Sequence, residues 1–311
     1  MLCKHQLKKI VSSLKEGQII AFPTETVYAL AGDARNLSTI KRIFKLKNRP
    51  LNQPLSVLLP ENPKLETWAD DVSPMGQRLA SYFWPGPLTL ILNKKPSVFM
   101  ELTGGQAKIG LRVPDHAIAQ SLLKAFAGGL AAPSANRSSH FSPTQAIHVQ
   151  EEFGEQLEVI VDGGACPIGV ESTIVDVSAM TPKILRLGAI SQREIENIIN
   201  CEIILDLQVS TSHIGLACQQ ITPVGLQEVV YNYLNQGKSV TVLARHSVTM
   251  THENLFWITM PSDANLYGQV LYKHLREAEQ NSTDKILIEA VPASESWSGI
   301  QTVLEKYTAR I

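Results

Sequence analysis

Two hydrophobic patterns recur along the first part of the chain. Residues 7–14 carry apolar side chains at three- and four-residue spacing before Gly17, which predicts an amphipathic helix. Residues 19–22 form a short apolar run that is typical of a buried strand. The same patterns predict further helices at 38–46, 76–83, 116–126, from Ser142 and from Ser191, and further strands at 56–59, 88–92, 108–113, 130–132, 157–162, 173–177 and 183–187. Strands and helices do not alternate strictly, so we expect an α/β domain with a twisted mixed sheet and packed helices.

Two serines are expected to begin helices. Ser38 precedes the second apolar helical pattern and would cap it. Ser142 is followed by Pro143, a pair typical of a helix start because proline fits the first helical position.

The pattern changes near residues 206–225, which are rich in Ser, Thr, Gln and Gly and have no clear periodicity. Such a segment is typical of a linker between domains. Beyond it, the patterns predict helices at 226–234, 264–278 and 298–309 and strands at 239–244, 255–260 and 285–290. We therefore expect a small Rossmann-like α/β domain with a parallel sheet. The predicted division is a catalytic domain at 1–205, a linker at 206–225 and a small C-terminal domain at 226–311.

Composition narrows the classes of protein that fit. The 311 residues are 44% hydrophobic and 18% charged, which is ordinary for a packed protein. Their net charge of -1 argues against a dedicated non-specific nucleic-acid binder. No apolar run is long enough to span a bilayer, and the N-terminus lacks a signal-peptide core. The four cysteines are scattered, which predicts neither a zinc site nor a disulfide framework and favours a cytoplasmic location.

The sequence lacks the short signatures of common catalytic centres. It has no G-x-S-x-G, no P-loop and no H-E-x-x-H, and its eight histidines are not spaced as metal pairs. Polar loops instead follow apolar strands, where ligands of open sheets tend to bind. In the first of these loops, the Thr24 and Thr26 hydroxyls either bind a polar ligand or cap a following turn.

Basic residues supply most of the remaining candidate chemistry. Lys47 and Arg49 lie in the densest basic cluster, which either grips a carboxylate or phosphate or forms a solvated helix end. Arg112 lies inside an apolar strand, where an inward side chain needs an anionic partner and an outward one belongs to a polar face; of these two orientations we favour the inward one. The loop 133–138, followed by Ser142, offers hydroxyls and backbone amides that suit phosphate oxygens, although its composition is also that of an ordinary loop.

We expect several of these cations to meet in one basic cavity. Its predicted members are Lys47, Arg49, Arg112 and Arg186. No strong base or nucleophile accompanies them, so they suit a substrate that already bears negative charge. Catalysis would then rest on positioning and charge stabilisation, as in phosphoryl or nucleotidyl transfer.

The motifs PTETVYALAGDA, KNRPLNQPLSV, WPGPLTLIL, GLRVPDH, APSAN, SPT, DGG, ESTIVDVS and ILRLGAIS occur in this order. In that order they resemble the YrdC-type threonylcarbamoyl-AMP synthase family over roughly residues 8–200. The segments NLYGQVLYKHLREAE, DKILIEAVP and SWSGIQTVLEKY resemble, less closely, the C-terminal domain of the two-domain members.

The resemblance implies a nucleotidyltransferase that forms threonylcarbamoyl-AMP and pyrophosphate from L-threonine, bicarbonate and ATP. The nucleophile would belong to the substrate, because the carbamate oxygen attacks the α-phosphate. Mg²⁺ would travel with ATP, and the protein would need no metal site of its own. A separate transferase complex would use the product to modify a tRNA adenosine next to the anticodon, with direct tRNA contact weak or indirect and no membrane partner.

The resemblance also implies roles for residues at matching positions. The expected catalytic residues are Lys47, Arg49 and Arg112. L-Threonine or its carbamate would be held by Thr26, Arg112 and Ser172, with Arg112 facing the carboxylate. ATP would be held by Arg49, Gln53, Lys108, Ser134, Asn136, Ser142 and Arg186.

Several positions depart from the family's common pattern. Leu58 stands where many two-domain members carry a histidine, and Gln53 replaces a usual asparagine. Ala132 and Lys108 each replace a frequent threonine. Residues 217–223 lack the histidine and tyrosine of the family's linker motif, whose tyrosine approaches the active site.

Other functions remain open at this stage. The chain could be an inactive RNA-binding or nucleotide-binding module of the same fold, with Lys41, Arg42 and Lys45 facing phosphates. Such binding should fall steeply with added salt and survive without ATP. An enzyme that uses carbamoyl phosphate fits less well, because the sequence shows no acylphosphatase or metal-binding segment.

Overall fold

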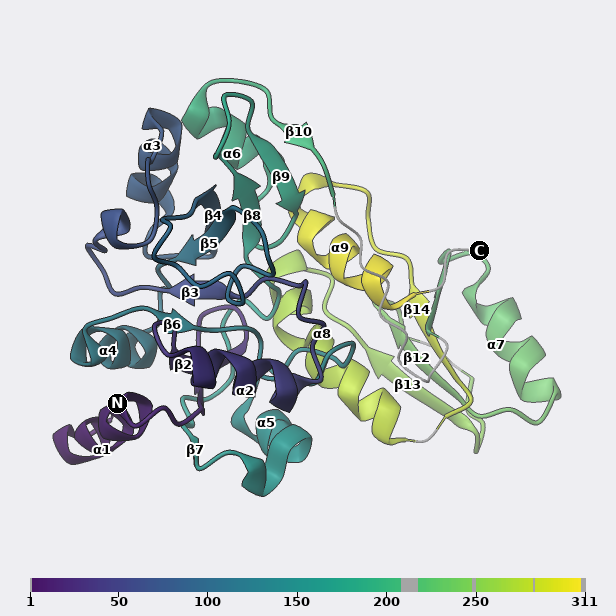
Figure 1. The fold of residues 1–311 in the computed structure, drawn as a ribbon. Helices are drawn as coiled ribbons and strands as arrows, with labels where there is room; N and C mark the ends of the chain where they lie inside the picture. Colours follow the sequence, from purple (N-terminus) through teal and green to yellow (C-terminus); the bar gives the residue numbers. More distant parts are fainter. Residues whose placement is uncertain (1, 208–217, 248–249, 282, 309–311) are drawn as a thin grey trace. The chain divides into compact units, whose positions relative to one another are not determined.

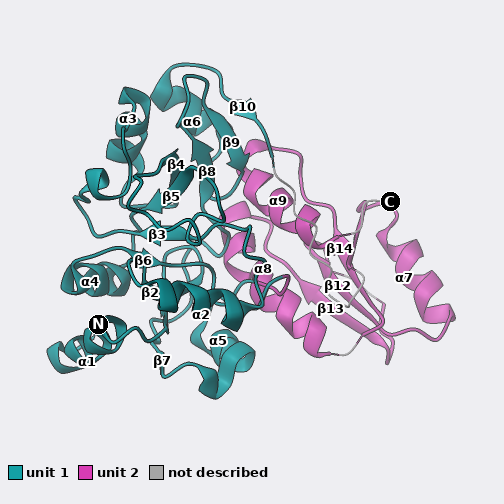
Figure 2. Cartoon of the chain, in the orientation of Figure 1, with its two compact units in different colours: residues 1–138, 142–208 teal, residues 139–141, 209–311 magenta. Residues whose placement is uncertain are grey.

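The computed structural model describes residues 2–207, 218–247, 250–281 and 283–308 (Figure 1). The chain divides into two compact units, each described here by itself (Figure 2). Unit 1 comprises residues 1–138 and 142–208, and unit 2 comprises residues 139–141 and 209–311.

Unit 1 is built on a mixed sheet, as the sequence predicts. Its strands are β1 (Ile20–Pro23), β2 (Tyr28–Asp33), β3 (Ser56–Leu58), β4 (Leu88–Asn93), β5 (Lys108–Arg112), β6 (Leu130–Ala131), β7 (Val159–Ile160), β8 (Thr173–Asp176), β9 (Lys183–Arg186) and β10 (Ile204–Leu205). They lie in the order β10-β9-β8-β4-β5-β3-β6-β2-β1-β7. For example, β5 pairs in parallel with β3 and antiparallel with β4, which brings strands from distant parts of the sequence together.

Helices cover both faces of this sheet. They are α1 (Lys4–Lys15), α2 (Leu37–Lys47), α3 (Pro74–Phe83), α4 (Ala117–Phe126), α5 (Ala146–Phe153) and α6 (Gln192–Ile199), with short 3-10 turns at Leu65–Thr67 and Gly154–Gln156. Ile20 and Phe22 of β1 pack with apolar residues of α1 and α4, whereas Ala21 between them packs with those of α2 and α5. Successive side chains of a strand point to opposite faces, so a four-residue strand serves two hydrophobic layers.

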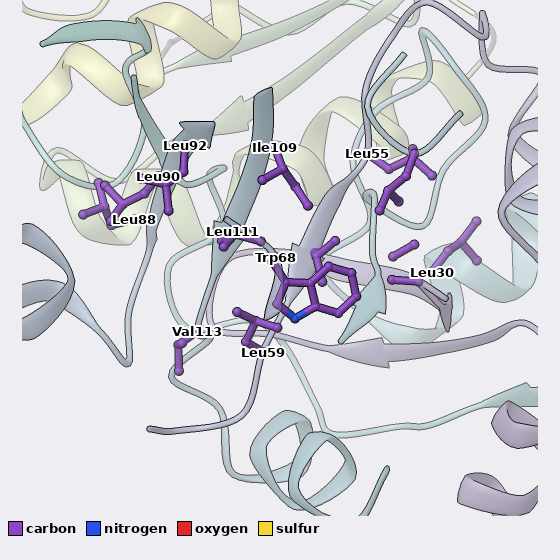
Figure 3. Packing of buried hydrophobic residues seen from close by; sticks show 14 of the residues in the cluster. Leu30, Leu55, Leu59, Trp68, Leu88, Leu90, Leu92, Ile109, Leu111 and Val113 are labelled. Atoms are coloured by element: carbon purple, nitrogen blue, oxygen red, sulfur yellow. The ribbon is translucent and has the colours of Figure 1, made fainter. Parts of the chain in front are cut away.

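The centre of the sheet is apolar on the face that is covered by α2 and α5. Figure 3 shows Leu88, Leu90 and Leu92 of β4 beside residues of the neighbouring β5 segment, and the register pairs Leu90 with Leu111. These side chains are essentially excluded from solvent. Their burial fixes β5, and with it the position of Arg112 at the end of that strand.

Two predicted helix starts are wrong. Asn36, not Ser38, caps α2, because its Oδ1 accepts a hydrogen bond from the Thr39 amide at 3.1 Å. Helix α5 begins at Ala146 rather than near Ser142. The carbonyl of Pro143 accepts a 2.8 Å hydrogen bond from Tyr28 N at the start of β2, so a tertiary contact holds this segment outside the helix.

Unit 2 contains a four-stranded parallel sheet, in agreement with the predicted small α/β domain. Its elements are β11 (Cys218–Ile221), α7 (Leu226–Asn235), β12 (Val240–Ala244), β13 (Leu255–Thr259), α8 (Ala264–Gln280), β14 (Lys285–Glu289), a 3-10 turn (Glu295–Trp297) and α9 (Ser298–Tyr307). The strand order is β11-β14-β12-β13, and every pairing is parallel. Helix α7 covers one face, and α8 and α9 cover the other (Figure 1).

The predicted linker 206–225 needs one correction. Residues 208–217 of it lie outside the described residues. Cys218–Ile221 are not linker, because they form β11 and pair in parallel with β14. No helix within the described ranges has the length and apolarity needed to cross a membrane.

Candidate active site

Arg112 is a buried cation of unit 1. It ends β5 and is only 7% exposed, so its side chain points inward. Its Nη2 donates to the Thr26 hydroxyl at 3.0 Å and lies 2.6 Å from Glu25 Oε1, while Nε donates to the Gly86 carbonyl at 3.3 Å. Glu25 and Thr26 belong to the loop between β1 and β2, and β3 and β6 separate β2 from β5 in the sheet. The contact therefore crosses over two strands and brings two sequence motifs into one site.

The β1–β2 loop is held by its own hydroxyls. The Thr24 and Thr26 hydroxyl oxygens lie 2.9 Å apart, and Thr24 Oγ1 donates to the Val27 carbonyl at 2.7 Å. No helix follows these threonines, because strand β2 begins directly after the loop. The alternative of a turn cap is confirmed for Thr24, whose Oγ1 accepts from the Thr26 amide at 3.2 Å and from the Val27 amide at 3.3 Å. Thr24 closes the turn, and the fully buried Thr26 is directed to Arg112.

Ser172 lies beside a second cation. Arg186 donates to the Ser172 carbonyl through Nε at 3.0 Å and Nη2 at 2.8 Å, and Nη2 also lies 3.1 Å from the Ser172 hydroxyl. The next residue, Thr173, donates its amide to the Pro87 carbonyl at 3.0 Å. Arg112 donates to the carbonyl of Gly86, the residue before Pro87. The adjacent residues Gly86 and Pro87 therefore link Arg112 to the segment that Arg186 holds.

Arg49 lies close to Arg186. It is half-buried, and it donates to the Gln53 carbonyl at 3.2 Å and the Pro54 carbonyl at 2.9 Å. Burial and the positive charge of Arg186 lower the pKa of Arg49 to about 10. Two cations that repel one another in a partly buried place are stabilised by an anion that binds both. This arrangement suits a phosphate chain.

Lys47 anchors a loop. It is 1% exposed, and its ammonium group donates to the backbone carbonyls of Ser134 and Asn136. The structure thus removes the alternative of a solvated helix end for this residue. An ammonium group can donate at most three hydrogen bonds, and Lys47 directs two of them to this loop. Its main role is therefore to position the loop that contains Ser134 and Asn136.

Ser142 joins that loop to the segment before β8. Its hydroxyl donates to Glu171 Oε1 at 2.8 Å, and Glu171 directly precedes Ser172. Asn136 is 4% exposed, and its Nδ2 donates to the Arg137 carbonyl at 2.8 Å. The serine-rich loop and the segment containing Ser172 therefore form one connected polar region.

Comparison with known proteins identifies the family. Residues 12–188 match the Sua5/YciO/YrdC family model, described as telomere recombination, and residues 131–307 match the model of the threonylcarbamoyl-AMP synthase C-terminal domain. A threonylcarbamoyl-AMP synthase of Pyrococcus abyssi is 35% identical over 299 residues, which cover 89% of this chain and 86% of the relative. This chain belongs to the threonylcarbamoyl-AMP synthase family.

Further relatives agree with this assignment. The Bacillus subtilis threonylcarbamoyl-AMP synthase is 32% identical over 306 residues, covering 92% of this chain and 88% of the relative. The crystal structure of P. abyssi Sua5 complexed with L-threonine has a TM-score of 0.89 and 32% identity, covering 98% of this chain and 95% of that one. The family's two-domain fold is therefore the fold of this chain.

Two residues expected to contact ATP are placed differently from the rest. Lys108 begins β5 and lies four residues before Arg112, roughly 13 Å away at about 3.3 Å per residue. Its ammonium pairs with Asp176 Oδ2 at 2.7 Å, so in the structure its charge is directed to this carboxylate. Gln53 is close to the site through its backbone carbonyl, which accepts from Arg49.

The two apolar departures from the family pattern lie in the hydrophobic layer. Leu58 and Ala132 belong to the buried cluster that packs with α1 and α4, and they are 3% and 9% exposed. At each position an apolar side chain that packs in this cluster stands in place of the polar side chain of the common pattern.

Sequence reasoning missed two residues that shape the site. Tyr28 donates its hydroxyl to the Gly164 carbonyl at 2.8 Å and accepts from Gly163 N at 3.1 Å, which holds the DGG segment against β2. Burial, followed by weaker local contributions, raises the pKa of Tyr28 to about 12, so the hydroxyl keeps its proton. Glu25 was the other. The only signal for it in the sequence was the expectation that a buried arginine requires an anionic partner, which could be an acidic residue of another motif.

Proposed function

We propose that this chain is an enzyme that makes threonylcarbamoyl-AMP and pyrophosphate from L-threonine, bicarbonate and ATP. Family membership supports the activity. The single observation that carries the assignment to this site is the linked pair of cations, with Arg112 on Thr26 and Gly86 and Arg186 on Ser172. One cation suits a carboxylate, and the other, beside Arg49, suits phosphates.

In this proposal the substrates divide between the two cations. Threonine binds at Thr26, Arg112 and Ser172, with its carboxylate on Arg112. The phosphates of ATP bind at Arg49 and Arg186. The loop with Ser134, Asn136 and Ser142 also contacts ATP, and Lys47 acts by positioning this loop.

The transfer step needs no protein nucleophile. A carbamate oxygen of N-carboxythreonine forms a bond to the α-phosphorus of ATP, and the bond between that phosphorus and the α–β bridging oxygen breaks. Pyrophosphate leaves with the negative charge. Arg49 and Arg186 stabilise this charge as it develops, an effect typically of about 2.7–4 kcal/mol per well-placed donor.

Further parts of the proposal concern ions and partners. No group of three or more His, Cys, Asp or Glu in the described part of the chain could hold a metal ion. We infer that Mg²⁺ arrives with the ATP phosphates. A transferase complex would then pass the threonylcarbamoyl group to tRNA, and a cytoplasmic location stays a prediction from the sequence.

The test is pyrophosphate release from ATP, with mass spectrometry of the nucleotide product. We expect release only when threonine, bicarbonate and ATP are all present, together with the mass of threonylcarbamoyl-AMP. The R49A variant should lose at least about 100-fold in turnover. No product from a folded wild-type protein that still binds ATP or RNA would contradict the proposal and favour a binding module.

A further inference from the structure

Glu25 is a buried carboxylate with unused hydrogen-bonding capacity. It is 4% exposed, and Arg112 Nη2 lies 2.6 Å from its Oε1 as an ion pair. Neither carboxylate oxygen accepts a hydrogen bond from any described residue. Buried polar groups almost always have such partners, and leaving one without them is unfavourable. A folded protein that keeps this arrangement needs an explanation for it.

The arginine beside Glu25 also has an available donor. Within the described residues, Arg112 makes its contacts through Nε and Nη2, which leaves Nη1 for a ligand. An acceptor pair of oxygens and a cationic donor thus lie next to each other. An α-amino acid carries an ammonium and a carboxylate on one carbon, so its two charges match this adjacent anion and cation.

Resting on the proposed function, we propose that Glu25 binds the α-ammonium group of threonine and is the base that prepares it for carbamate formation. Glu25 takes one ammonium proton, which leaves a lone pair on nitrogen. That pair forms the N–C bond to bicarbonate, while the bicarbonate hydroxyl leaves as water with the proton from Glu25. The nitrogen then loses its second proton to the regenerated carboxylate, from which it passes to solvent.

The neighbouring titratable groups differ from Glu25 in charge. The groups that face Glu25 are Arg112, His116 and Cys166. Burial lowers the pKa of His116, against the weaker opposing charges of Glu25 and Asp115, so the imidazole holds a proton less readily than usual. Burial raises the pKa of the Cys166 thiol to about 12, so it remains neutral. Glu25 is the anion among these groups.

The experiment compares E25Q and E25D with wild type and with the matched control E289Q. Glu289 is also a buried carboxylate that pairs with an arginine, but in unit 2, so E289Q reports the cost of losing such a carboxylate elsewhere. Three quantities are measured for each protein: kcat/KM for threonine between pH 6 and pH 9, the dissociation constant of ATP without threonine, and the affinity for threonine by calorimetry.

We expect E25Q to lower kcat/KM for threonine by about 10²- to 10⁴-fold while ATP affinity stays within about twofold of wild type. The E25Q rate should rise about tenfold per pH unit, because deprotonation by solvent replaces the base, whereas the wild-type profile is flatter. E25D should recover part of the loss, and E289Q should retain wild-type kcat/KM.

Three results would overturn the proposal. In the first, E25Q turns over threonine within about threefold of wild type. In the second, ATP affinity falls in parallel with activity, which indicates a structural role only. In the third, the E25Q defect does not change with pH. If wild type itself makes no threonylcarbamoyl-AMP, the proposed function fails separately. Threonine affinity then decides, since weaker binding by E25Q supports ammonium recognition and equal binding contradicts it.

Discussion

Both units bury a glutamate against an arginine, but the two pairs are built differently. In unit 2, Glu289 is 2% exposed and accepts from Arg245 Nη2 at 2.7 Å, from Arg245 N at 2.8 Å and lies 3.0 Å from His246 Nδ1. In unit 1, Glu25 is similarly buried and close to Arg112, yet its oxygens accept no hydrogen bond from the described residues. Both glutamates are buried beside an arginine, and they differ in the hydrogen bonds that they accept.

This difference separates a structural pair from a candidate functional one. A buried charge that is fully hydrogen-bonded is held by the protein itself, and it stabilises one local conformation. A buried charge with open acceptor positions is costly in the free protein, and a ligand that donates hydrogen bonds offsets the cost. Mutations of the two pairs should therefore act on different properties, stability in unit 2 and catalysis in unit 1.

The largest effect is expected from E289A. It leaves Arg245 beside an empty volume with only the Ala290 carbonyl as acceptor, and breaking a buried pair typically destabilises by about 3–5 kcal/mol. Thermal unfolding and proteolysis should show that unit 2 unfolds more readily. If the variant unfolds like wild type, the hydrogen-bonded pair does not stabilise unit 2, and it does not differ from the Glu25 pair in the way that we expect.

R112M should follow, with a loss of about 100- to 1,000-fold in kcat/KM for threonine, or about 2.7–4 kcal/mol. It also leaves Glu25 as a buried charge without a cation, so a fall in stability could mimic a catalytic effect. The double variant R112M/E25Q removes this charge and should regain stability without regaining activity. Recovery of activity in the double variant would show that Arg112 has no direct role.

K47M addresses the loop rather than the ion pairs. Its side chain keeps much of the volume but cannot donate to the Ser134 and Asn136 carbonyls. We expect about 10- to 100-fold weaker ATP binding, with threonine affinity changed less, because the loop faces the nucleotide in the proposed function. Equilibrium dialysis with each substrate alone measures both. An equal loss for both substrates would indicate a general distortion of unit 1.

The fold was largely predictable because most elements follow from local hydrophobic patterns. Strand β2 was missed because it follows directly on the polar turn at Thr24, and its pairing with β1 and β6 is a non-local property. The start at Ser142 was mistaken for the same reason, since a contact with Tyr28 outweighs the local preference for a helix cap.

The candidate site was predictable in its residues and less so in their roles. Arg112 was expected to point inward, and it does. Lys47 was expected on phosphates, but its resting contacts are backbone carbonyls, which no residue pattern encodes. The role of Glu25 could not be predicted, because its contact with Arg112 depends on how the β1–β2 loop and β5 are placed across two strands. That placement follows from the sheet topology and not from the spacing of residues in the sequence.

Acid pH should destabilise unit 2 by a smaller amount than E289A does. Burial alone would raise the pKa of Glu289, but hydrogen bonds from His246 and Arg245 lower it below its ordinary value of 4.5. This contribution to stability is therefore present above about pH 4.5 and is lost as pH falls through the lower folded-state pKa. Protonation keeps the carboxyl oxygens as partners, so the loss is partial. When the stability of E289Q is measured over the same pH range, it should lack the part of the pH dependence that comes from the titration of Glu289.

The smallest effect is expected from K108A, which tests the limit of the site along β5. Lys108 forms an ion pair with Asp176 in which its side chain is 41% exposed, and such pairs contribute about 0–1 kcal/mol. The residue begins the strand that Arg112 ends, so at about 3.3 Å per residue its backbone lies roughly 13 Å from that of Arg112, and its ammonium is already paired with Asp176. ATP affinity should therefore remain within about twofold of wild type. A tenfold loss would instead show that the nucleotide reaches both ends of β5, and it would restore the role that family resemblance alone implies for this position.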